Sequence, residues 1–468
     1  MALHIESATD PAQYLEDASG QRGVADRAFA PAGISTLREI LREASASQTP
    51  TTIAGARTGL TGGAVPLGGW VISLERFNQL SIRSGSARAG AGATLRQIQR
   101  DAAPSGQFFP PDPTETLASL GGAISNNASG SRSFRYGPIR RHVLALQVVL
   151  MDGRTLSVAR GDKVDFPTPT IPLPNTTKHS AGYYLRPDLD WIDLFIGSEG
   201  TLGIVTEAEI RLLPSPTAIL AGVVFFEHDD AALAAVRAWR SIEGLRMLEY
   251  MDTGSLNLLR MKYPEIPLGA RAALLLEQEL SPQVGDDAVE TQAVDFWNDQ
   301  LTAYSGFDTS WFGTSALDRE RFRVFRHALP EEVNKLVRRN GVQKLGTDFA
   351  VPIDRNEVIL EYYRKRCNES FPGQHVIFGH IGDAHLHVNL LPAERARVAV
   401  ANELILDFAR MAVALGGTIG AEHGLGKRKA NFLPLLYTAE QIEAMRDVKR
   451  RLDPQWLLGR GTLFPFNE

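Results

Sequence analysis

The sequence has almost no cysteine: Cys367 is the only one among 468 residues. A single cysteine cannot form an intrachain disulfide, and it cannot supply the set of thiolates that an iron–sulfur cluster or a cysteine-ligated zinc requires. Such a chain suits a reducing compartment, and we therefore expect a cytoplasmic protein.

Long hydrophobic runs are also absent. No stretch of about 18 consecutive apolar residues occurs, and residues 1–20 carry acidic side chains in place of the apolar core of a signal peptide. We expect neither secretion nor a transmembrane segment. A peripheral position at the inner face of a membrane is still compatible, because it needs only a docking patch. The net charge of −5 and the lack of a long basic run argue against a nucleic-acid partner.

One glycine-rich loop lacks the features of two common phosphate-binding motifs. The segment Ala54–Gly63 (AGARTGLTGG) has no Gly-Lys-Ser/Thr of a Walker A loop and no Gly-x-Gly-x-x-Gly of a nicotinamide Rossmann turn. Phosphoryl transfer and classical NAD binding therefore lose support. What the loop does have is four glycines after a β-type run, which allow backbone N–H groups to approach an anion closely. A flexible surface turn is the alternative.

The order of apolar runs indicates an α+β protein with more than one domain. A chain of this length is expected to contain two or three domains. We place a boundary at the Pro-Ser-Pro sequence that ends a first domain at residue 214. Residues 215–410 alternate β-type and helical stretches, which predicts an α/β sandwich with helices on one sheet face. Residues 411–468 carry one more loop and a helix.

Two further segments, Pro110–Gly130 and Ile196–Thr206, are rich in small residues. Together with Ala54–Gly63 they resemble, in the same order, the flavoprotein family of vanillyl-alcohol oxidase and p-cresol methylhydroxylase. The resemblance runs from residue 30 to residue 465. It implies a two-part FAD-binding domain (1–214), a substrate or cap domain with metal-site histidines (215–410), and a C-terminal helical segment (411–468) that returns to the FAD domain.

The resemblance also implies which residues hold FAD. They are Gly55, Arg57, Thr58, Gly59, Leu60, Thr61, Gly62 and Gly63 in the first segment; Pro111, Thr114, Ser119, Gly121, Gly122, Asn126, Ala128, Ser129 and Gly130, followed by Tyr136 and Gly137, in the second; and Glu199, Gly203, Ile204 and Val205 in the third. Some members attach FAD covalently through histidine or cysteine. Residues 55–63 contain neither, so we expect noncovalent FAD.

Three histidines lie close together in the segment Phe378–Asn389 (FGHIGDAHLHVN). A strand, a turn and a second strand would let His380 and His387 meet. Two histidines suit a borderline divalent metal such as zinc, but two ligands are too few for a stable site. The segment GGTIGAEHGLG adds Glu422 beside His423. The alternative is that these histidines are ordinary hydrogen-bonding residues and that the Glu-His pair is an exposed turn.

The two clusters together resemble the metal-dependent D-2-hydroxyacid dehydrogenase branch of the same family. The resemblance implies that His380, His387 and Glu422 are metal ligands, that His423 is the catalytic base and that Asn389 contacts substrate. The metal expected is zinc, with manganese as an alternative. Branch members usually have Gly-Asn where this chain has Ala384-His385. His385 is therefore a fourth ligand or a substrate contact.

The substrate carboxylate needs a cation. By resemblance, Arg326 holds it, and Lys344 lies near the second basic residue of the branch at altered spacing; a solvated helix face is the alternative for Arg326. In the expected reaction, a bound divalent ion lowers the pKa of the substrate hydroxyl, His423 takes its proton, and hydride passes to flavin N5. We expect D stereochemistry and a monocarboxylate such as D-lactate.

Three functions compete on the sequence alone. The first is an FAD- and metal-dependent dehydrogenase that oxidises a D-2-hydroxy acid (D-lactate, D-2-hydroxyglutarate or glycolate) and passes electrons to a quinone, a cytochrome or an electron-transfer flavoprotein. The second is an oxygen-using oxidase of the same fold, and the third is a non-catalytic FAD-carrying subunit of a larger complex. The joint presence of His380, His387, Glu422 and His423 argues against the third. A homodimer is compatible with the sequence.

Overall fold

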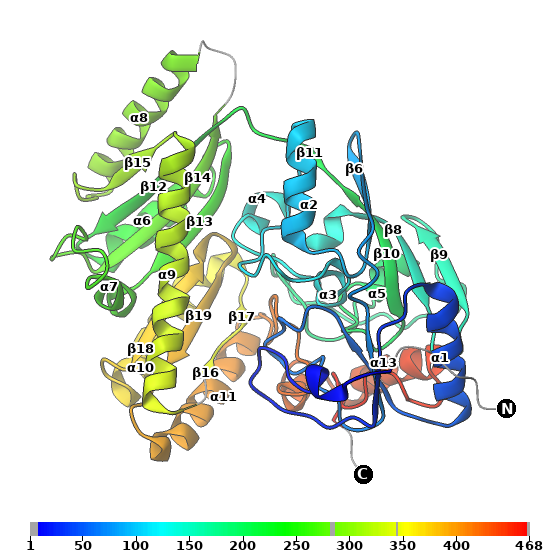
Figure 1. Ribbon diagram of the computed structural model, residues 1–468. Coiled ribbons are helices and arrows are strands. Elements are labelled where there is room, and N and C mark those ends of the chain that lie inside the picture. Colours follow the sequence, from blue (N-terminus) through cyan, green and yellow to red (C-terminus); the bar gives the residue numbers. More distant parts are fainter. Residues whose placement is uncertain (1–7, 281–285, 343–344, 466–468) are drawn as a thin grey trace.

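Two groups of strands organise the chain in the computed structural model, which describes residues 8–280, 286–342 and 345–465. The strands of one group all precede residue 215, and those of the other all follow residue 217. Figure 1 shows the two groups as separate parts of the molecule. Among the described residues, none of the helices combines the length and apolar character that a membrane crossing requires.

The N-terminal part contains two sheets in the described residues. One has the order β1-β2-β4-β3 and the other the order β5-β6-β10-β8-β9, while β7 pairs with β11. The strands are β1 (Ala8–Thr9), β2 (Arg27–Phe29), β3 (Thr51–Ala54), β4 (Trp70–Ser73), β5 (Leu80–Arg83), β6 (Ser86–Gly90), β7 (Gln107–Phe108), β8 (Val143–Val149), β9 (Thr155–Ala159), β10 (Ile204–Arg211) and β11 (Leu213–Pro214). The helices are α1 (Ile34–Ala46), α2 (Leu95–Ala102), α3 (Leu120–Ser125), α4 (Ser133–Tyr136) and α5 (Trp191–Phe195).

The first sheet shows why these segments fold as they do. β4 is an apolar run that is buried along its whole length and lies parallel to both β2 and β3. In α1, Leu37, Ile40, Leu41 and Ala44 recur at helical spacing and are all buried. This stripe packs on one face of the sheet, in the same cluster as Trp70. The loop at residues 55–63 leaves the sheet at the end of β3.

The second part is built on one long sheet. Its order is β15-β12-β14-β13-β18-β19-β16, and β17 also pairs with β19. The strands are β12 (Ala218–Phe226), β13 (Leu245–Met251), β14 (Ala272–Leu280), β15 (Trp311–Gly313), β16 (Leu345–Gly346), β17 (Phe349–Ala350), β18 (His375–His380) and β19 (His385–Leu390). The helices are α6 (Asp229–Trp239), α7 (Thr253–Leu259), α8 (Asp286–Ala303), α9 (Ala316–Asn340), α10 (Asn356–Ser370) and α11 (Val398–Ala414).

The expectation that helices cover one face of this sheet is wrong. In β12, Val223 and Phe225 belong to the apolar cluster that α7 and α9 cover, whereas Val224 and Phe226 belong to the cluster of α6, α8, α10 and α11. Strand residues alternate between faces, so a continuous apolar run such as β12 is buried on both sides. The long helix α9 runs along the sheet (Figure 1) and contains Arg326.

The last segment of the chain lies against the N-terminal part. It contains α12 (Leu433–Leu436) and α13 (Ala439–Leu452), and beyond α13 Leu458 bridges to Thr51 of β3. The buried ammonium of Lys449 donates to the carbonyl oxygens of Thr201 (2.7 Å) and Leu458 (2.8 Å). α11 runs across residue 410. The domain bounds at residues 214 and 410 stay predictions.

Candidate active site

Two consecutive strands bring three histidines together. β18 and β19 form an antiparallel pair in which His380 lies opposite His385, and Phe378 lies opposite His387. The turn between them holds Ala384 in the left-handed region, at φ 52°. His385 and His387 share one face of β19, and their ring centroids are 4.4 Å apart. Their distances from the ring of His380 are 5.2 and 5.5 Å respectively.

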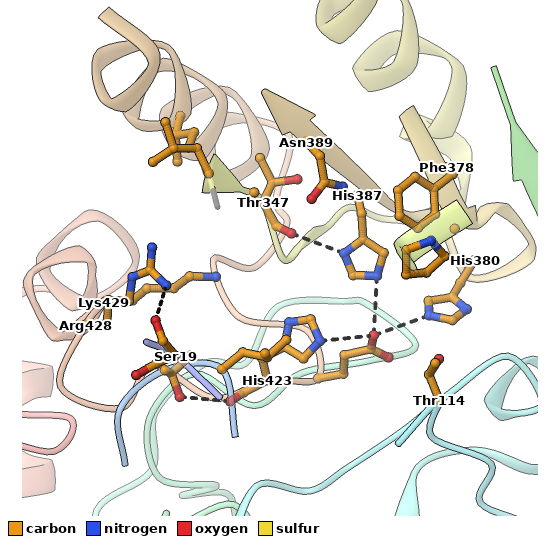
Figure 2. A pocket seen from close by; sticks show the side chains of 18 of the residues that line it. Ser19, Thr114, Thr347, Phe378, His380, His387, Asn389, His423, Arg428 and Lys429 are labelled. Carbon is orange, nitrogen blue, oxygen red and sulfur yellow. Dashed lines mark hydrogen bonds and ion pairs between the residues drawn. The ribbon is translucent and has the colours of Figure 1, made fainter. Parts of the chain in front are cut away.

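The loop after α11 places a carboxylate among these rings. Glu422 Oε1 lies 3.3 Å from His380 Nε2 and 3.3 Å from His387 Nε2. The Nε2 atom of His423 is 3.6 Å from the same oxygen. Figure 2 shows His380, His387 and His423 turned toward one point on the pocket wall, with dashed lines from each to the oxygen that they share.

The opposite nitrogens of His380 and His387 face other acceptors. His380 Nδ1 is 2.5 Å from Glu249 Oε1, and Arg326 Nε donates to Glu249 Oε2 at 2.9 Å. His387 Nδ1 is 3.1 Å from the carbonyl oxygen of Thr347. Acceptors at Nδ1 fix the ring tautomer and leave the Nε2 lone pairs directed toward Glu422. Arg326 and His380 are thus coupled through one carboxylate.

The second oxygen of Glu422 is held from the N-terminal part of the chain. Lys178 Nζ donates to Oε2 at 3.0 Å, and Ser129 Oγ donates to it at 3.2 Å. Lys178 is fully buried and also lies 3.7 Å from Asp383 Oδ2. These contacts leave Oε1 as the oxygen that faces His380 and His387.

Asp348 organises the loop that carries Glu422 and His423. Its Oδ2 accepts the backbone N–H groups of Ala421 (3.2 Å) and His423 (3.0 Å). Its Oδ1 lies 3.3 Å from His423 Nδ1. A proton on Nδ1 then faces a carboxylate, and the Nε2 atom of His423 keeps a free lone pair toward the cavity.

The charges of the site are strongly coupled. Burial opposes ionisation of Glu422 and Glu249, but Lys178 and His380 outweigh it for the first, and Arg326 and His380 for the second, so that both pKa values lie well below the usual range. Burial lowers the pKa of His423 despite the opposing charge of Asp348. His423 is therefore neutral at a lower pH than an exposed histidine would be, which suits a proton acceptor.

The donor set fits a divalent cation. One ligand atom from each of His380, His385, His387 and Glu422 lies within 4.8 Å of the others. One ligand atom from each of Asp348, Glu422 and His423 also lies within 4.8 Å of the others. The oxygens of Asp348, however, already accept hydrogen bonds from the backbone of the loop that carries Glu422 and His423. Buried carboxylates gather around these donors: Glu249, Asp348, Asp383 and Glu422 lie beside the cations Lys178 and Arg326, and the charge of Lys429 also acts on Asp348. Mixed nitrogen and oxygen donors suit zinc or manganese.

The three glycine-rich segments meet beside this cluster. The backbone N–H of Ala56 donates to Ser119 Oγ at 3.3 Å, which joins the first segment to the second. The backbone N–H of Glu199 donates to the carbonyl oxygen of Ser125 at 2.7 Å, which joins the second to the third. The Glu199 carboxylate accepts the backbone N–H groups of Leu425 and Gly426 at 2.8 and 2.7 Å. All three segments thus converge on the loop that carries His423.

Parts of these segments fit a large ligand with phosphates. A Cβ at Gly63 would meet open space, so the backbone there faces no other group. The Oη atom of Tyr136 is buried and has no hydrogen-bond partner among the described residues. Other glycines are required by packing instead: a Cβ at Gly130 would lie 1.9 Å from the carbonyl oxygen of Asp112. A buried unpaired hydroxyl and an unobstructed glycine backbone are each consistent with a bound flavin nucleotide.

The structure separates the predicted FAD residues into two groups. Leu60, Thr61 and Thr114 line the main cavity, together with Arg326, His380, His387, Asn389, Glu422 and His423. At the start of β10, Ile204 and Val205 are buried in apolar clusters, and a Cβ at Gly203 would meet Val148 at 2.6 Å. The roles of all predicted site residues stay predictions, and Lys344 lies outside the described residues.

The cavity has a volume of about 560 Å³, large enough for a small substrate and part of a cofactor. His380, His387 and Glu422 form part of one wall. Ser19, Arg428 and Lys429 lie at some distance from His380 across the cavity in Figure 2. The cavity therefore offers positive charge both at Arg326 and beside His423.

Sequence reasoning missed three residues that hold the cluster: Lys178, Glu249 and Asp348. Glu249 had a signal, because a carboxylate within the buried strand β13 requires a partner. Asp348 immediately precedes the apolar strand β17 and is weaker evidence of the same kind. Lys178 stands in an irregular segment, and no pattern in the sequence marked it.

The fold is shared with a solved structure. A structure of alkyldihydroxyacetonephosphate synthase superposes with a TM-score of 0.67 at 15% sequence identity, covering 94% of this chain and 76% of that one. The α+β arrangement with an FAD-binding part and a cap sheet is therefore confirmed.

Sequence comparisons give the family. The family model described as "FAD binding domain" matches residues 25–159. The model described as "FAD linked oxidases, C-terminal domain" matches residues 215–463. A D-lactate dehydrogenase of Archaeoglobus fulgidus is 31% identical over 92% of this chain and 89% of its own length. A glycolate oxidase subunit GlcD of Bacillus subtilis is 29% identical over 96% of this chain and 92% of its own length. A D-2-hydroxyglutarate dehydrogenase of Xanthomonas citri is also 29% identical, over 93% of this chain and 88% of its own length. The chain belongs to the FAD-linked oxidase family.

Proposed function

We propose that the protein oxidises a D-2-hydroxy acid to the 2-oxo acid, with noncovalent FAD and a divalent cation. The observation that carries the proposal is the convergence of His380, His387 and Glu422 Oε1 beside His423, on a cavity that Arg326 also lines. Relatives named D-lactate dehydrogenase and D-2-hydroxyglutarate dehydrogenase support the substrate class.

His380, His387 and Glu422 would hold the cation, which would supply Lewis-acid polarisation of the substrate hydroxyl. His423 accepts the hydroxyl proton at Nε2, because its Nδ1 faces the Asp348 carboxylate. The lowered pKa of His423 keeps this base neutral and available near neutral pH.

Arg326 and Asn389 position the substrate. Arg326 is always charged, and its guanidinium can hold a carboxylate through two N–H groups while Nε stays on Glu249. Asn389 follows His387 on the same face of β19 and lines the same cavity. Contacts at the hydroxyl and the carboxylate orient the remaining hydrogen of the reacting carbon, so one enantiomer is favoured.

The three glycine-rich segments would hold FAD, which supplies the hydride acceptor when bound. The first of them has no histidine or cysteine for covalent attachment. Electrons then leave to a carrier such as a quinone, a cytochrome or an electron-transfer flavoprotein. Acid precipitation of the purified yellow protein should release the flavin into the supernatant, and a flavin that stays with the precipitate contradicts noncovalent binding.

The deciding experiment compares substrates. The purified protein is assayed with an artificial dye acceptor and the D and L forms of lactate and 2-hydroxyglutarate. We expect the D forms to have the higher kcat/KM and D-lactate to exceed D-2-hydroxyglutarate. Faster L turnover contradicts the stereochemistry, and a strong preference for the dicarboxylate contradicts only the size. Activity with none of these acids contradicts the proposed function.

A further inference from the structure

The three histidines of the β18–β19 pair share one arrangement around Glu422. In His380 and His387, one ring nitrogen faces an acceptor and the other lies 3.3 Å from Glu422 Oε1. His385 repeats this pattern on the other oxygen. Its Nε2 lies 3.1 Å from Asp348 Oδ1, and its Nδ1 lies 3.9 Å from Glu422 Oε2.

His385 differs from its neighbours in that its ring nitrogens lack hydrogen bonds. The side chain is fully buried, yet neither ring nitrogen has a hydrogen-bond partner among the described residues, although Nε2 lies 3.1 Å from Asp348 Oδ1. An unsatisfied buried polar group is costly. His179 shows the ordinary solution: it is also enclosed, and its nitrogens bond the hydroxyls of Thr418 (2.9 Å) and Tyr437 (3.1 Å).

The surroundings of His385 leave few roles for it. Its side chain has no exposed surface, and it is absent from the described residues that line the cavity, so it does not reach a substrate there. Two lone-pair-bearing atoms, Nδ1 of a neutral imidazole and a carboxylate oxygen, face each other across 3.9 Å. Lys178 and Ser129 already donate to that oxygen, but Nδ1 of His385 has no hydrogen-bond partner among the described residues, so the pairing is repulsive unless a cation or a proton lies between the two atoms. A metal bonded to nitrogen and oxygen at about 2.0–2.2 Å each spans such a gap.

We propose that His385 is a fourth protein ligand, through Nδ1, of the divalent cation that His380, His387 and Glu422 hold. The inference rests on the metal site of the proposed function. Asp348 behind Nε2 then completes a carboxylate–histidine–metal arrangement like that of Glu249 behind His380. A third imidazole also moves the preference of the site toward zinc and cobalt and away from manganese, which favours oxygen ligands.

The decisive measurement counts imidazoles on the metal. The flavin-loaded protein is stripped of metal, reloaded with one equivalent of Zn²⁺, and examined by zinc K-edge X-ray absorption. We expect the multiple-scattering pattern of three imidazole ligands. A pattern of two imidazoles overturns the proposal and leaves the proposed function intact. Failure to bind Zn²⁺ or any other divalent ion overturns both.

Variants test the same ligand independently. His385→Asn should weaken Zn²⁺ at least about tenfold in competition with a chromophoric chelator, and should reduce the ratio of Zn²⁺ to Mn²⁺ affinity. His375→Asn is the matched control, because His375 lies on β18 outside the cluster and bonds the carbonyl oxygen of Phe371. Its affinity for Zn²⁺ should match that of the unmodified protein.

The variants also separate ligation from folding. Flavin content and the urea midpoint of the metal-free protein are measured for His385→Asn and for the control. If His385→Asn loses zinc affinity while the metal-free midpoint and the flavin content stay unchanged, the side chain acts on the metal. Unchanged zinc affinity in His385→Asn overturns the proposal.

Discussion

Asp348 fixes His423 at two points, its backbone and its ring. The carboxylate accepts the backbone N–H of His423 at 3.0 Å through one oxygen and lies 3.3 Å from Nδ1 through the other. A single buried carboxylate therefore sets both the position of the loop and the direction of the imidazole. The pairing also places negative charge beside the ring that is proposed to become protonated.

Replacing Asp348 should impair the proton acceptor. In Asp348→Asn the side chain keeps its size but loses its charge, so a protonated His423 is less stable and the ring tautomer is no longer fixed. We expect kcat to fall by about 10²-fold or more, and the acid limb of the kcat/KM profile to shift to lower pH. Asp354→Asn, an exposed residue in the same segment, is the control. An unchanged profile in Asp348→Asn speaks against this role.

Replacing His423 should slow the chemical step without weakening the binding of flavin or zinc. His423→Ala should lower kcat by about 10²–10⁴-fold, as expected for the loss of a general base. Flavin content and zinc affinity should stay close to those of the unmodified protein, because His423 is not among the proposed ligands. A loss of zinc equal to that in His387→Ala would assign His423 to the metal instead.

Arg326 and Glu249 should have different kinetic signatures. Arg326→Ala removes a contact with the carboxylate that exists in both ground and transition states, so it should mainly raise KM. Glu249→Gln weakens the support of His380 and of Arg326 together. We expect it to raise KM and also to weaken zinc about 10–100-fold. Zinc titrations and steady-state kinetics on both variants check the distinction; equal zinc affinities contradict it.

Metal removal should stop turnover and spare the flavin. Exhaustive dialysis against a chelator removes an ion held by His380, His387 and Glu422, while the glycine-rich segments keep their contacts. We expect activity to be lost, the flavin absorption spectrum to persist, and Zn²⁺ to restore turnover. Full activity in a preparation shown to be free of metal contradicts the assignment.

Stability should fall in mild acid, in part through His179. Burial lowers the pKa of His179 to about 3 from its ordinary value near 6.5, so below pH 6.5 the unfolded chain binds a proton that the folded chain does not. Its contribution is complete above that pH and is lost as pH falls, at up to about 1.4 kcal/mol per pH unit. The free energy of unfolding, measured in urea at pH 7.5 and at pH 5, should differ less between the two pH values in His179→Gln than in the unmodified protein. An equal difference in both proteins contradicts this role of His179.

The local motifs could be predicted from the sequence, whereas the residues that hold the side chains of these motifs in place could not. Period-two spacing in Phe378–Asn389 predicted the strand pair, and the glycine-rich segments predicted the α+β flavoprotein fold. Glu249 and Lys178 meet the cluster only through the packing of β13 and of an irregular segment against it. Such long-range contacts have no local signature, because they depend on which buried charges face each other once the sheets have packed.

The helices of the second sheet show the same limit. A continuous apolar strand such as β12 is compatible with burial on one face or on both, and helical stretches read from the sequence do not show which face each helix covers. The tertiary arrangement decided this, by placing α7 and α9 opposite α6, α8, α10 and α11. Arg326 depends on that choice, since it reaches Glu249 from α9.

The loop that carries Glu422 has a consequence for biosynthesis. A ribosome delivers the chain from its N-terminus, so the strand pair with its histidines is complete before Glu422 and His423 have been made. A translation product that stops at residue 414, where α11 ends, has the imidazoles but neither the carboxylate nor the loop that Glu199 holds. In the proposed function, the carboxylate ligand and the proton acceptor are therefore the last parts of the site to be made, and a product that ends at residue 414 should have no activity although its three histidines are present.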